Sequence, residues 1–373
     1  MPFSKLGLNK HLLKQIAASD FKKPYPIQEN VIPKVLAGKD VLGIAKTGSG
    51  KTAAFVWPLL TLLEKPKTKR NRFVRSLILV PTRELAEQIK DVIYEYSTNL
   101  PYLIKTLAVY GGVSINPQMQ KMSGTDILVA TPGRLLDLLS QNAVRLTDLE
   151  VLILDEADKM LNLGFKDEMD KILSFLPNKR QNLLFSATLN ENIEEITQLV
   201  LRNPVVVKLN EEENNLDQID QIAYALLEEE KGPFLRKLIA ENNWQQVLVF
   251  VSSTHVADKV AHKLCKNDIH AASIHSKKTQ GARNENLRKF RSGHLRVLVA
   301  TDLLARGIDI DFLPYVVNYE LPRSPKDYVH RIGRTGRAEN PGKAVSFINA
   351  EDAHHFKIIQ KKMKLKVEIL SIK

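Results

Sequence analysis

Residues 41–52 read Val-Leu-Gly-Ile-Ala-Lys-Thr-Gly-Ser-Gly-Lys-Thr and decide the fold of the first half of the chain. The first four form an apolar run typical of a buried strand, and a helical pattern follows Thr52. Between them, Gly48 and Gly50 let backbone amides approach an anion at the start of a helix. Lys51 can then contact the β- and γ-phosphates of a nucleotide, while the Thr52 hydroxyl can ligate Mg²⁺. The sequence therefore predicts a nucleotide-binding α/β domain.

Ala45 stands where the usual pattern G-x-x-x-x-G-K-[ST] has a glycine. This difference points away from small GTPases and toward the form of the loop that helicases use.

A nucleoside triphosphatase also needs a carboxylate near its metal ion and a group that orients the attacking water. Residues 155–158, Asp-Glu-Ala-Asp, come directly after the apolar run 151–154, and ligands of α/β sheets gather at carboxyl ends of strands. We expect Asp155 to hold Mg²⁺ through water and Glu156 to act as the general base. Acidic residues also cap helix N-termini, and it is the pairing with the phosphate loop that favours catalysis.

Apolar runs alternate with helical patterns along both halves of the chain. The predicted strands are 41–45, 76–80, 127–130, 151–154, 183–186 and 205–207, then 247–251, 271–274, 297–300, 315–318 and 344–348. Predicted helices include 84–100, 133–140, 254–267 and 280–290, with a basic helix at 356–370. This order predicts an α/β protein of two doubly wound domains with parallel sheets.

Residues 210–221 are acidic and poor in apolar side chains, as linkers between domains usually are. They divide the chain into a first domain, 1–209, and a second domain, 222–373. The alternative of a long surface loop inside one domain stays open.

The net charge of the 373-residue chain is +12, and both halves are basic. This charge suits a polyanion that contacts both domains, although solubility alone explains it equally well. No run of 18 apolar residues is present, so no membrane span is expected. A single cysteine, Cys265, excludes an internal disulfide and fits a reducing compartment, so we expect a cytoplasmic protein.

The tetrapeptide at 155–158 is the name-giving motif of the DEAD-box RNA helicases, and the chain resembles that family from about Phe3 to its end. Within the family it looks most similar to compact bacterial RhlE-like members. The motifs follow the family's order and spacing. The resemblance implies two tandem RecA-like domains, RNA-dependent ATP hydrolysis, and ATP with Mg²⁺ as cofactors.

Residues 21–28 resemble the family's adenine-binding Q motif. The Gln28 amide can donate to and accept from adenine at once, and Phe21 offers an aromatic face for stacking. Asp20 replaces the glycine that often precedes this aromatic residue. By resemblance, the ATP-binding residues are Phe21, Gln28, Ala45, Lys46, Thr47, Gly48, Ser49, Gly50, Lys51, Thr52, Gly307 and Asp309.

Further motifs imply an RNA-binding surface. The implied contacts are Pro81, Thr82, Arg83, Gly112, Thr131, Pro132, Gly133, Arg134, Arg283 and Thr301. Thr-Pro-Gly is also a common helix start, and Ser276 replaces the usual glycine after His275. By resemblance, Asp158, Ser186, Thr188 and His330 couple the ATP and RNA sites.

Residues 330–337, His-Arg-Ile-Gly-Arg-Thr-Gly-Arg, resemble the family's arginine-finger segment. Arg334 and Arg337 are then expected to reach the γ-phosphate from the second domain and to act with Lys51, Asp155 and Glu156 in catalysis. Guanidinium groups suit an anionic transition state.

The expected function is ATP-driven closure of two domains that locally unwinds short RNA duplexes or remodels RNA–protein complexes, with weak sequence preference. We expect a monomer without membrane contact, with ribosomal or RNA-decay proteins as partners. A motor that tracks along DNA and a non-unwinding RNA clamp remain alternatives, because the clamp needs the same motifs.

Overall fold

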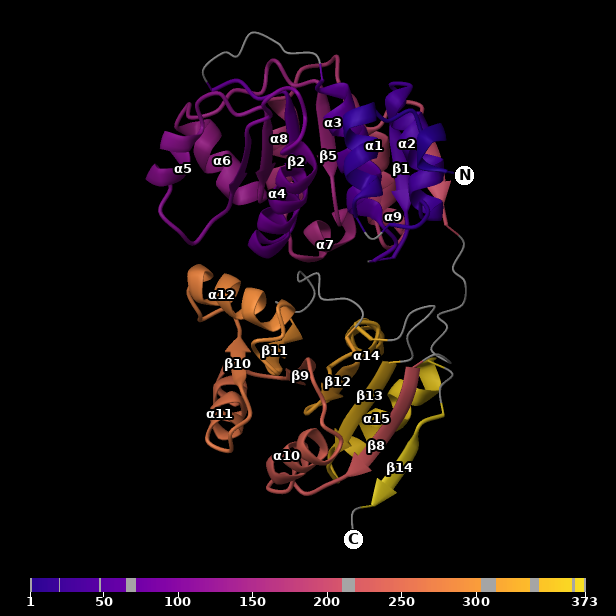
Figure 1. The fold of residues 1–373 in the computed structure, drawn as a ribbon, viewed down its shortest axis with the longest axis vertical. Coiled ribbons are helices and arrows are strands. Elements are labelled where there is room, and N and C mark those ends of the chain that lie inside the picture. Colours follow the sequence, from indigo (N-terminus) through magenta and orange to yellow (C-terminus); the bar gives the residue numbers. More distant parts are fainter. Residues whose placement is uncertain are drawn as a thin grey trace. The chain divides into compact units, whose positions relative to one another are not determined.

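The computed structural model describes residues 2–19, 21–46, 48–64, 72–209, 219–302, 313–335, 342–363 and 366–371. The chain folds into two compact units, Met1–Asn210 and Glu211–Lys373. Each unit contains a seven-stranded sheet with helices (Figure 1). Within the described residues, no helix is both long and apolar enough to cross a membrane.

The sheet of unit 1 has the strand order β3-β4-β2-β5-β6-β1-β7, and neighbouring strands are parallel. Its strands are β1 Val41–Ile44, β2 Ser76–Leu79, β3 Thr106–Val109, β4 Ile127–Ala130, β5 Val151–Leu154, β6 Gln181–Ser186 and β7 Val205–Lys208. The central strands are apolar on both faces because helices cover both. Along β2, Ile78 enters one core and its neighbours Leu77 and Leu79 enter the other.

Two sets of helices form these cores. The helical elements are η1 Phe3–Lys5, α1 Lys10–Ala17, α2 Pro26–Leu36, α3 Lys51–Leu62, α4 Arg83–Ser97, α5 Asn116–Lys121, α6 Pro132–Ser140, α7 Ala157–Asn162, α8 Lys166–Ser174 and α9 Glu191–Val200. Helices α1 to α4 supply buried side chains to one core, and α6 to α9 supply them to the other.

Unit 2 repeats the parallel design with the strand order β10-β11-β9-β12-β13-β8-β14. Its strands are β8 Ile219–Ala225, β9 Val247–Val251, β10 Ala271–Ile274, β11 Val297–Thr301, β12 Tyr315–Asn318, β13 Gly342–Ile348 and β14 Glu368–Ser371. Its helices are α10 Lys231–Glu241, α11 Thr254–Cys265, α12 Gln280–Arg291, α14 Pro325–Ile332 and α15 Asp352–Met363. The fold class predicted from the sequence is confirmed.

One detail of the sequence analysis is wrong, and the expected linker overlaps a strand. The basic helix expected at 356–370 ends at Met363, and Glu368–Ser371 forms β14, which pairs with β8. Ile369 and Leu370 fit a strand because β8 offers backbone groups for pairing at the edge of the sheet. The linker expected at 210–221 overlaps β8, which begins at Ile219 and pairs with β13; residues 210–218 lie outside the described part.

Candidate ATP site and RNA-binding edge

Apart from Phe21 and Gln28, which precede β1, the predicted site residues of unit 1 follow the carboxyl ends of six parallel strands. The loop 45–50 follows β1, residues 81–83 follow β2, 111–112 follow β3, 131–134 follow β4, 155–158 follow β5, and 186–188 lie at the end of β6. Because the strands are parallel, these segments lie along one edge of the sheet. The structure therefore brings the predicted ATP and RNA residues of this unit to the same edge.

The phosphate loop joins β1 to α3. Gly50 is the N-cap of α3 with φ of 85°, a left-handed conformation that glycine adopts without strain. The Lys51 ammonium is buried and donates to the carbonyl oxygen of Ala45 at 2.6 Å, and the Ser49 hydroxyl donates to Lys46 O at 2.7 Å. Thr47 lies outside the described residues.

Charge and burial oppose each other at Lys51 and Asp155. Burial lowers the pKa of Lys51, and the nearby carboxylates of Asp155, Glu156 and Asp158 counteract it. Burial raises the pKa of Asp155 to about 6, against the pull of Lys51. The cation and the carboxylates therefore lie close enough to interact in a site largely shielded from solvent.

The acidic motif connects β5 to α7. The backbone N–H of Glu156 donates to Asp155 Oδ1 at 2.9 Å. Glu156 has φ of 53° and ψ of 45° as the N-cap of α7, a region that few non-glycine residues adopt. The Thr188 hydroxyl donates to Asp158 Oδ2 at 3.2 Å. The Ser186 hydroxyl donates to the Thr188 carbonyl at 2.7 Å.

The Q-motif glutamine is fixed against the phosphate loop. Gln28 is fully buried; its Oε1 accepts from Tyr25 N at 2.9 Å, and its Nε2 donates to Gly50 O at 3.2 Å. A Cβ at Gly50 would lie 2.6 Å from Gln28 Nε2, so this contact requires glycine. The Phe21 ring packs edge-on against Trp57 at 5.2 Å between centroids. One donor and one acceptor of the Gln28 amide remain for another group.

The predicted RNA residues of unit 1 occupy helix starts. Thr82 caps α4 by accepting from Leu85 N at 3.3 Å. A Cβ at Gly112 would meet the Arg83 guanidinium at 2.0 Å, so these two residues touch. Thr131 is the N-cap of α6, which Pro132 and Gly133 begin. The Arg134 guanidinium is buried and donates to Val113 O at 2.7 Å, so it holds the loop after β3.

Unit 2 places its predicted residues on β11, α12 and α14. Thr301 ends β11, Arg283 is buried on α12, and Arg334 is buried in the turn after α14. His330 is exposed on α14, with Nδ1 4.0 Å from Asp327 Oδ1. The predicted residues Gly307, Asp309 and Arg337 lie outside the described residues.

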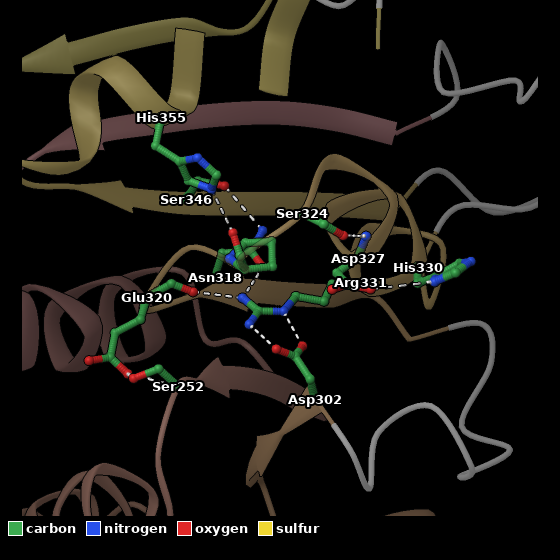
Figure 2. A network of polar contacts seen from close by, with 11 residues as sticks. Ser252, Asp302, Asn318, Glu320, Ser324, Asp327, His330, Arg331, Ser346 and His355 are labelled. Atoms are coloured by element: carbon green, nitrogen blue, oxygen red, sulfur yellow. Dashed lines mark hydrogen bonds and ion pairs between the residues drawn. The ribbon is translucent and has the colours of Figure 1, made fainter. Parts of the chain in front are cut away.

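Arg331 is a residue that sequence analysis did not single out. It is buried, and its guanidinium lies among Asp302, Asn318 and Glu320 (Figure 2). It donates to both Asp302 oxygens at 2.5 and 2.8 Å, to Asn318 Oδ1 at 3.1 Å and to Glu320 O at 2.6 Å. This network joins the residue after Thr301 to the helix before Arg334. In the sequence, Arg331 is one of several arginines in the segment 330–337, and nothing there marks it as different. Its partners can be seen only in the folded structure.

Together, the parallel sheets and the phosphate loop paired with buried carboxylates define a nucleoside triphosphatase of two α/β units. The chain matches the family model of DEAD/DEAH box helicases over residues 25–196. It also matches the model of the helicase conserved C-terminal domain over residues 230–339. The chain belongs to the DEAD-box family of ATP-dependent RNA helicases.

Curated relatives are similar over almost the whole chain. The ATP-dependent RNA helicase CshA of Listeria monocytogenes is 38% identical over 369 residues, which are 99% of this chain and 70% of the relative. The DEAD-box ATP-dependent RNA helicase CshA of Streptococcus pneumoniae is 40% identical, over 96% of this chain and 68% of the relative. The similarity to RhlE-like members stays a prediction.

Solved structures share the fold. S. cerevisiae Dbp5 bound to RNA and ADP BeF3 is 31% identical, with a TM-score of 0.84 and coverage of 99% of this chain and 95% of that chain. A DEAD box protein from the hyperthermophile Methanococcus jannaschii is 36% identical, with a TM-score of 0.56 and 99% coverage of both chains.

Proposed function

We propose that this helicase binds RNA mainly through its sugar–phosphate backbone and separates short duplexes locally, driven by ATP-dependent closure of its two units. The observation that carries the proposal is the shared edge of unit 1. There the buried Lys51 and Asp155 lie along the same sheet edge as the helix starts at Thr82 and Thr131. Because the proposed ATP and RNA sites lie on one sheet edge, the short segments between them can transmit a change at one site to the other.

Hydrolysis is assigned to residues of both units. Glu156 accepts a proton from water as the water oxygen attacks the γ-phosphorus, and the bond to the β-phosphate oxygen breaks to release ADP. Lys51 stabilises the negative charge of the phosphates, and Gln28 with Phe21 binds the adenine. Arg334 and Arg337 act as fingers from unit 2; a finger of this kind contributes about 10³ to 10⁵ in rate.

The residues fit a magnesium ion bound with ATP. Burial raises the pKa of Asp155 to about 6, and a divalent cation beside this carboxylate would favour its ionised form. Thr52 begins the same helix as Lys51 and supplies a hydroxyl. Mg²⁺ usually keeps several waters and binds one or two carboxylates together with phosphates, and it would supply charge neutralisation at the phosphates. We therefore assign Thr52 and Asp155 to its site.

RNA binding is assigned to helix starts and arginines that suit phosphates. Backbone amides and hydroxyls at Thr82 and Thr131 can donate to phosphate oxygens without contacting the bases. Contacts to ribose 2′-hydroxyls would favour RNA over DNA. The similar Dbp5 chain is bound to RNA and ADP BeF3, which supports an RNA site in a chain of this fold. Weak sequence preference follows.

We expect a cytoplasmic monomer whose RNA target is chosen with ribosomal or RNA-decay proteins, because a backbone-reading surface carries little sequence information.

Replacing Glu156 tests the catalytic assignment. Glu156→Gln keeps the size and hydrogen bonding of the side chain but removes the base, so ATP binding should persist while RNA-stimulated turnover falls at least a hundredfold. Steady-state ATPase assays and nucleotide titration measure the two effects. The matched control is Glu195→Gln, an exposed carboxylate on α9 paired with Lys166, which should leave turnover unchanged. Normal turnover in Glu156→Gln would remove Glu156 as the base.

A strand-displacement assay tests the unwinding step. A short RNA duplex with a single-stranded tail should separate only with ATP, and the wild-type protein should lose this activity on a long duplex. ATP-dependent binding without displacement would instead support the RNA clamp. Displacement of long DNA duplexes would support the DNA-tracking motor.

A further inference from the structure

The backbone of Glu156 is held in one conformation. Besides donating its N–H to Asp155, Glu156 accepts from Lys159 N at 2.9 Å and from Met160 N at 3.1 Å through its carbonyl oxygen. These bonds stabilise the left-handed φ of 53° at a residue that has a full side chain. The side chain must therefore leave the backbone in a fixed direction.

The carboxylate of Glu156 is held from one side. The Lys159 ammonium lies 2.6 Å from Glu156 Oε1, and only 21% and 10% of the two side chains are exposed. The second oxygen, Oε2, is buried and accepts no hydrogen bond from the described parts of the chain. Burying a carboxylate oxygen without a donor costs free energy, so this acceptor suits a donor that arrives with substrate.

Two exposed ion pairs on other helices lack these features. Lys166 and Glu195 form an ion pair between helices with both side chains about 60% exposed, and Arg288 pairs with Glu285 at a solvated surface of α12. Exposed pairs of this kind contribute little. The pair at Glu156 is distinguished by its burial and by its position at the carboxyl end of β5.

We propose that Lys159 is a positioning residue for Glu156. By binding Oε1, the ammonium fixes the plane of the carboxylate and leaves Oε2 as the acceptor for the proton of the attacking water. The inference rests on the proposed role of Glu156 as general base. Lys159 itself contacts neither the nucleotide nor the water in this scheme.

An alternative role for the same contact is inhibitory, as a lock that keeps Glu156 from acting as the base. Phosphoryl transfer depends chiefly on positioning and electrostatic stabilisation, with little demand on base strength. Orientation of the carboxylate toward the attacking water should therefore be the main contribution of the contact. Removing Lys159 should lower turnover, whereas removing a lock would raise it.

Two substitutions in the full-length chain test the proposal. Lys159→Met removes the charge at similar length and should lower the RNA-saturated kcat about tenfold, a part of the 10² to 10⁴ that a general base supplies. KM for ATP and Kd for RNA should change less than twofold. Lys159→Arg keeps the cation and should restore kcat to within threefold of wild type. The control Lys166→Met, which breaks the exposed pair with Glu195, should leave all three constants unchanged.

Several outcomes would overturn the inference. They are an unchanged or higher kcat in Lys159→Met, a failure of Lys159→Arg to restore kcat, or a loss of kcat matched by equal losses in RNA and ATP binding. The last result would indicate a general structural role. Thermal unfolding followed by fluorescence in a Trp244→Phe background, where the buried Trp57 alone reports, shows whether unit 1 of each variant is folded.

A double variant separates this inference from the proposed function. If Glu156 is the base and Lys159 acts through it, adding Lys159→Met to Glu156→Gln should cause no further loss of turnover. An additional tenfold loss would show that Lys159 acts independently and would reject the positioning role. If Glu156→Gln alone keeps turnover, the assignment of the base fails; if Glu156→Gln abolishes turnover and Lys159→Met has no effect, only the role of Lys159 fails.

Discussion

At the scale of single residues, Gly112 controls the position of Arg83. A Cβ at Gly112 would lie 2.0 Å from the Arg83 guanidinium, and the φ of Gly112 is 72°. Gly112→Ala should displace Arg83 and weaken RNA binding at least tenfold, since charge-assisted contacts are each worth about 1.5–3 kcal/mol and about 1.4 kcal/mol is a factor of ten. Fluorescence anisotropy with labelled RNA measures the change.

Gly124→Ala is the matched control for this prediction. Gly124 has φ of 71°, and a Cβ at this position would meet no atom within 4 Å, so the substitution adds the same backbone strain without touching Arg83. Both variants should lose about 1 kcal/mol of stability from that strain, but only Gly112→Ala should bind RNA more weakly. Equal RNA affinity in the two variants would separate Arg83 from RNA binding.

Sequence patterns predicted which candidate residues follow strands but not how their side chains pair. Lys51, Asp155 and Thr131 each come after an apolar run. A strand followed by a helix can be recognised from such local patterns of apolar residues. The partners of Arg331 lie on segments that are distant in sequence. The pairing of Lys159 with Glu156 depends on the backbone angle of Glu156, which no sequence pattern reveals. Local patterns therefore predict positions, and tertiary structure decides contacts.

At the scale of elements, Asp40 joins three segments of unit 1 at the start of β1. Its carboxylate accepts from Asn182 N at 2.8 Å, Asn182 Nδ2 at 3.0 Å and Arg202 N at 2.8 Å. Asp40→Ala should leave these buried donors without partners and lower the stability of unit 1 by about 3 kcal/mol. Denaturant unfolding in a Trp244→Phe background, where Trp57 alone reports, measures the loss; Asp91→Ala on the exposed face of α4 is the control. A loss below about 1 kcal/mol would contradict this account.

Helix α11 and strand β10 of unit 2 meet at Asp258. Burial alone would raise the pKa of this carboxyl, but donors from Ser273, His275 and Lys278 outweigh it and hold the pKa well below its usual range. A depressed pKa stabilises the fold above the unfolded pKa of about 3.9, and the effect is lost as pH falls through the folded value. Because Asp258 is half exposed, the contribution should be about 0.5 kcal/mol.

The variant Asp258→Asn measures this contribution directly. In a Trp57→Phe background, Trp244 reports unfolding of unit 2, and the stability difference between the proteins with and without Asp258→Asn should be largest near pH 6. It should shrink toward zero as pH falls below about 4. A difference that grows as pH falls would have the wrong sign for a depressed pKa.

The same scale explains which strands sequence analysis missed. β5, Val151–Leu154, is buried on both faces and reads as a continuous apolar run, so its pattern is unambiguous. β3 and β14 lie at sheet edges, where half-exposed positions dilute the apolar signal. β8 carries Asp220 and Gln221 among its apolar residues, which made its start look like part of a polar linker. β7 and β10 also lie at sheet edges and were predicted, so edge position alone did not decide which strands the sequence could reveal.

At the scale of the whole molecule, the proposed closure requires ATP and RNA to strengthen each other's binding equally. If both ligands favour the same closed state, linkage makes the factor by which ATP raises RNA affinity identical to the factor by which RNA raises ATP affinity. The two factors are typically about 5 to 150. The variant Glu156→Gln allows both to be measured with ATP itself, because hydrolysis is blocked.

Arg334 should transmit this coupling, because it belongs to unit 2 while the phosphate loop belongs to unit 1. Adding Arg334→Ala to Glu156→Gln should remove the γ-phosphate contact proposed for the closed state, so both factors should fall toward one while RNA affinity without nucleotide stays unchanged. Labelled RNA titrated with and without ATP, and labelled ATP titrated with and without RNA, give the two factors. Lys237→Ala, an exposed position on α10, is the control and should leave them intact. Coupling that survives Arg334→Ala would mean that closure does not depend on this arginine, and unequal factors would reject a single closed state.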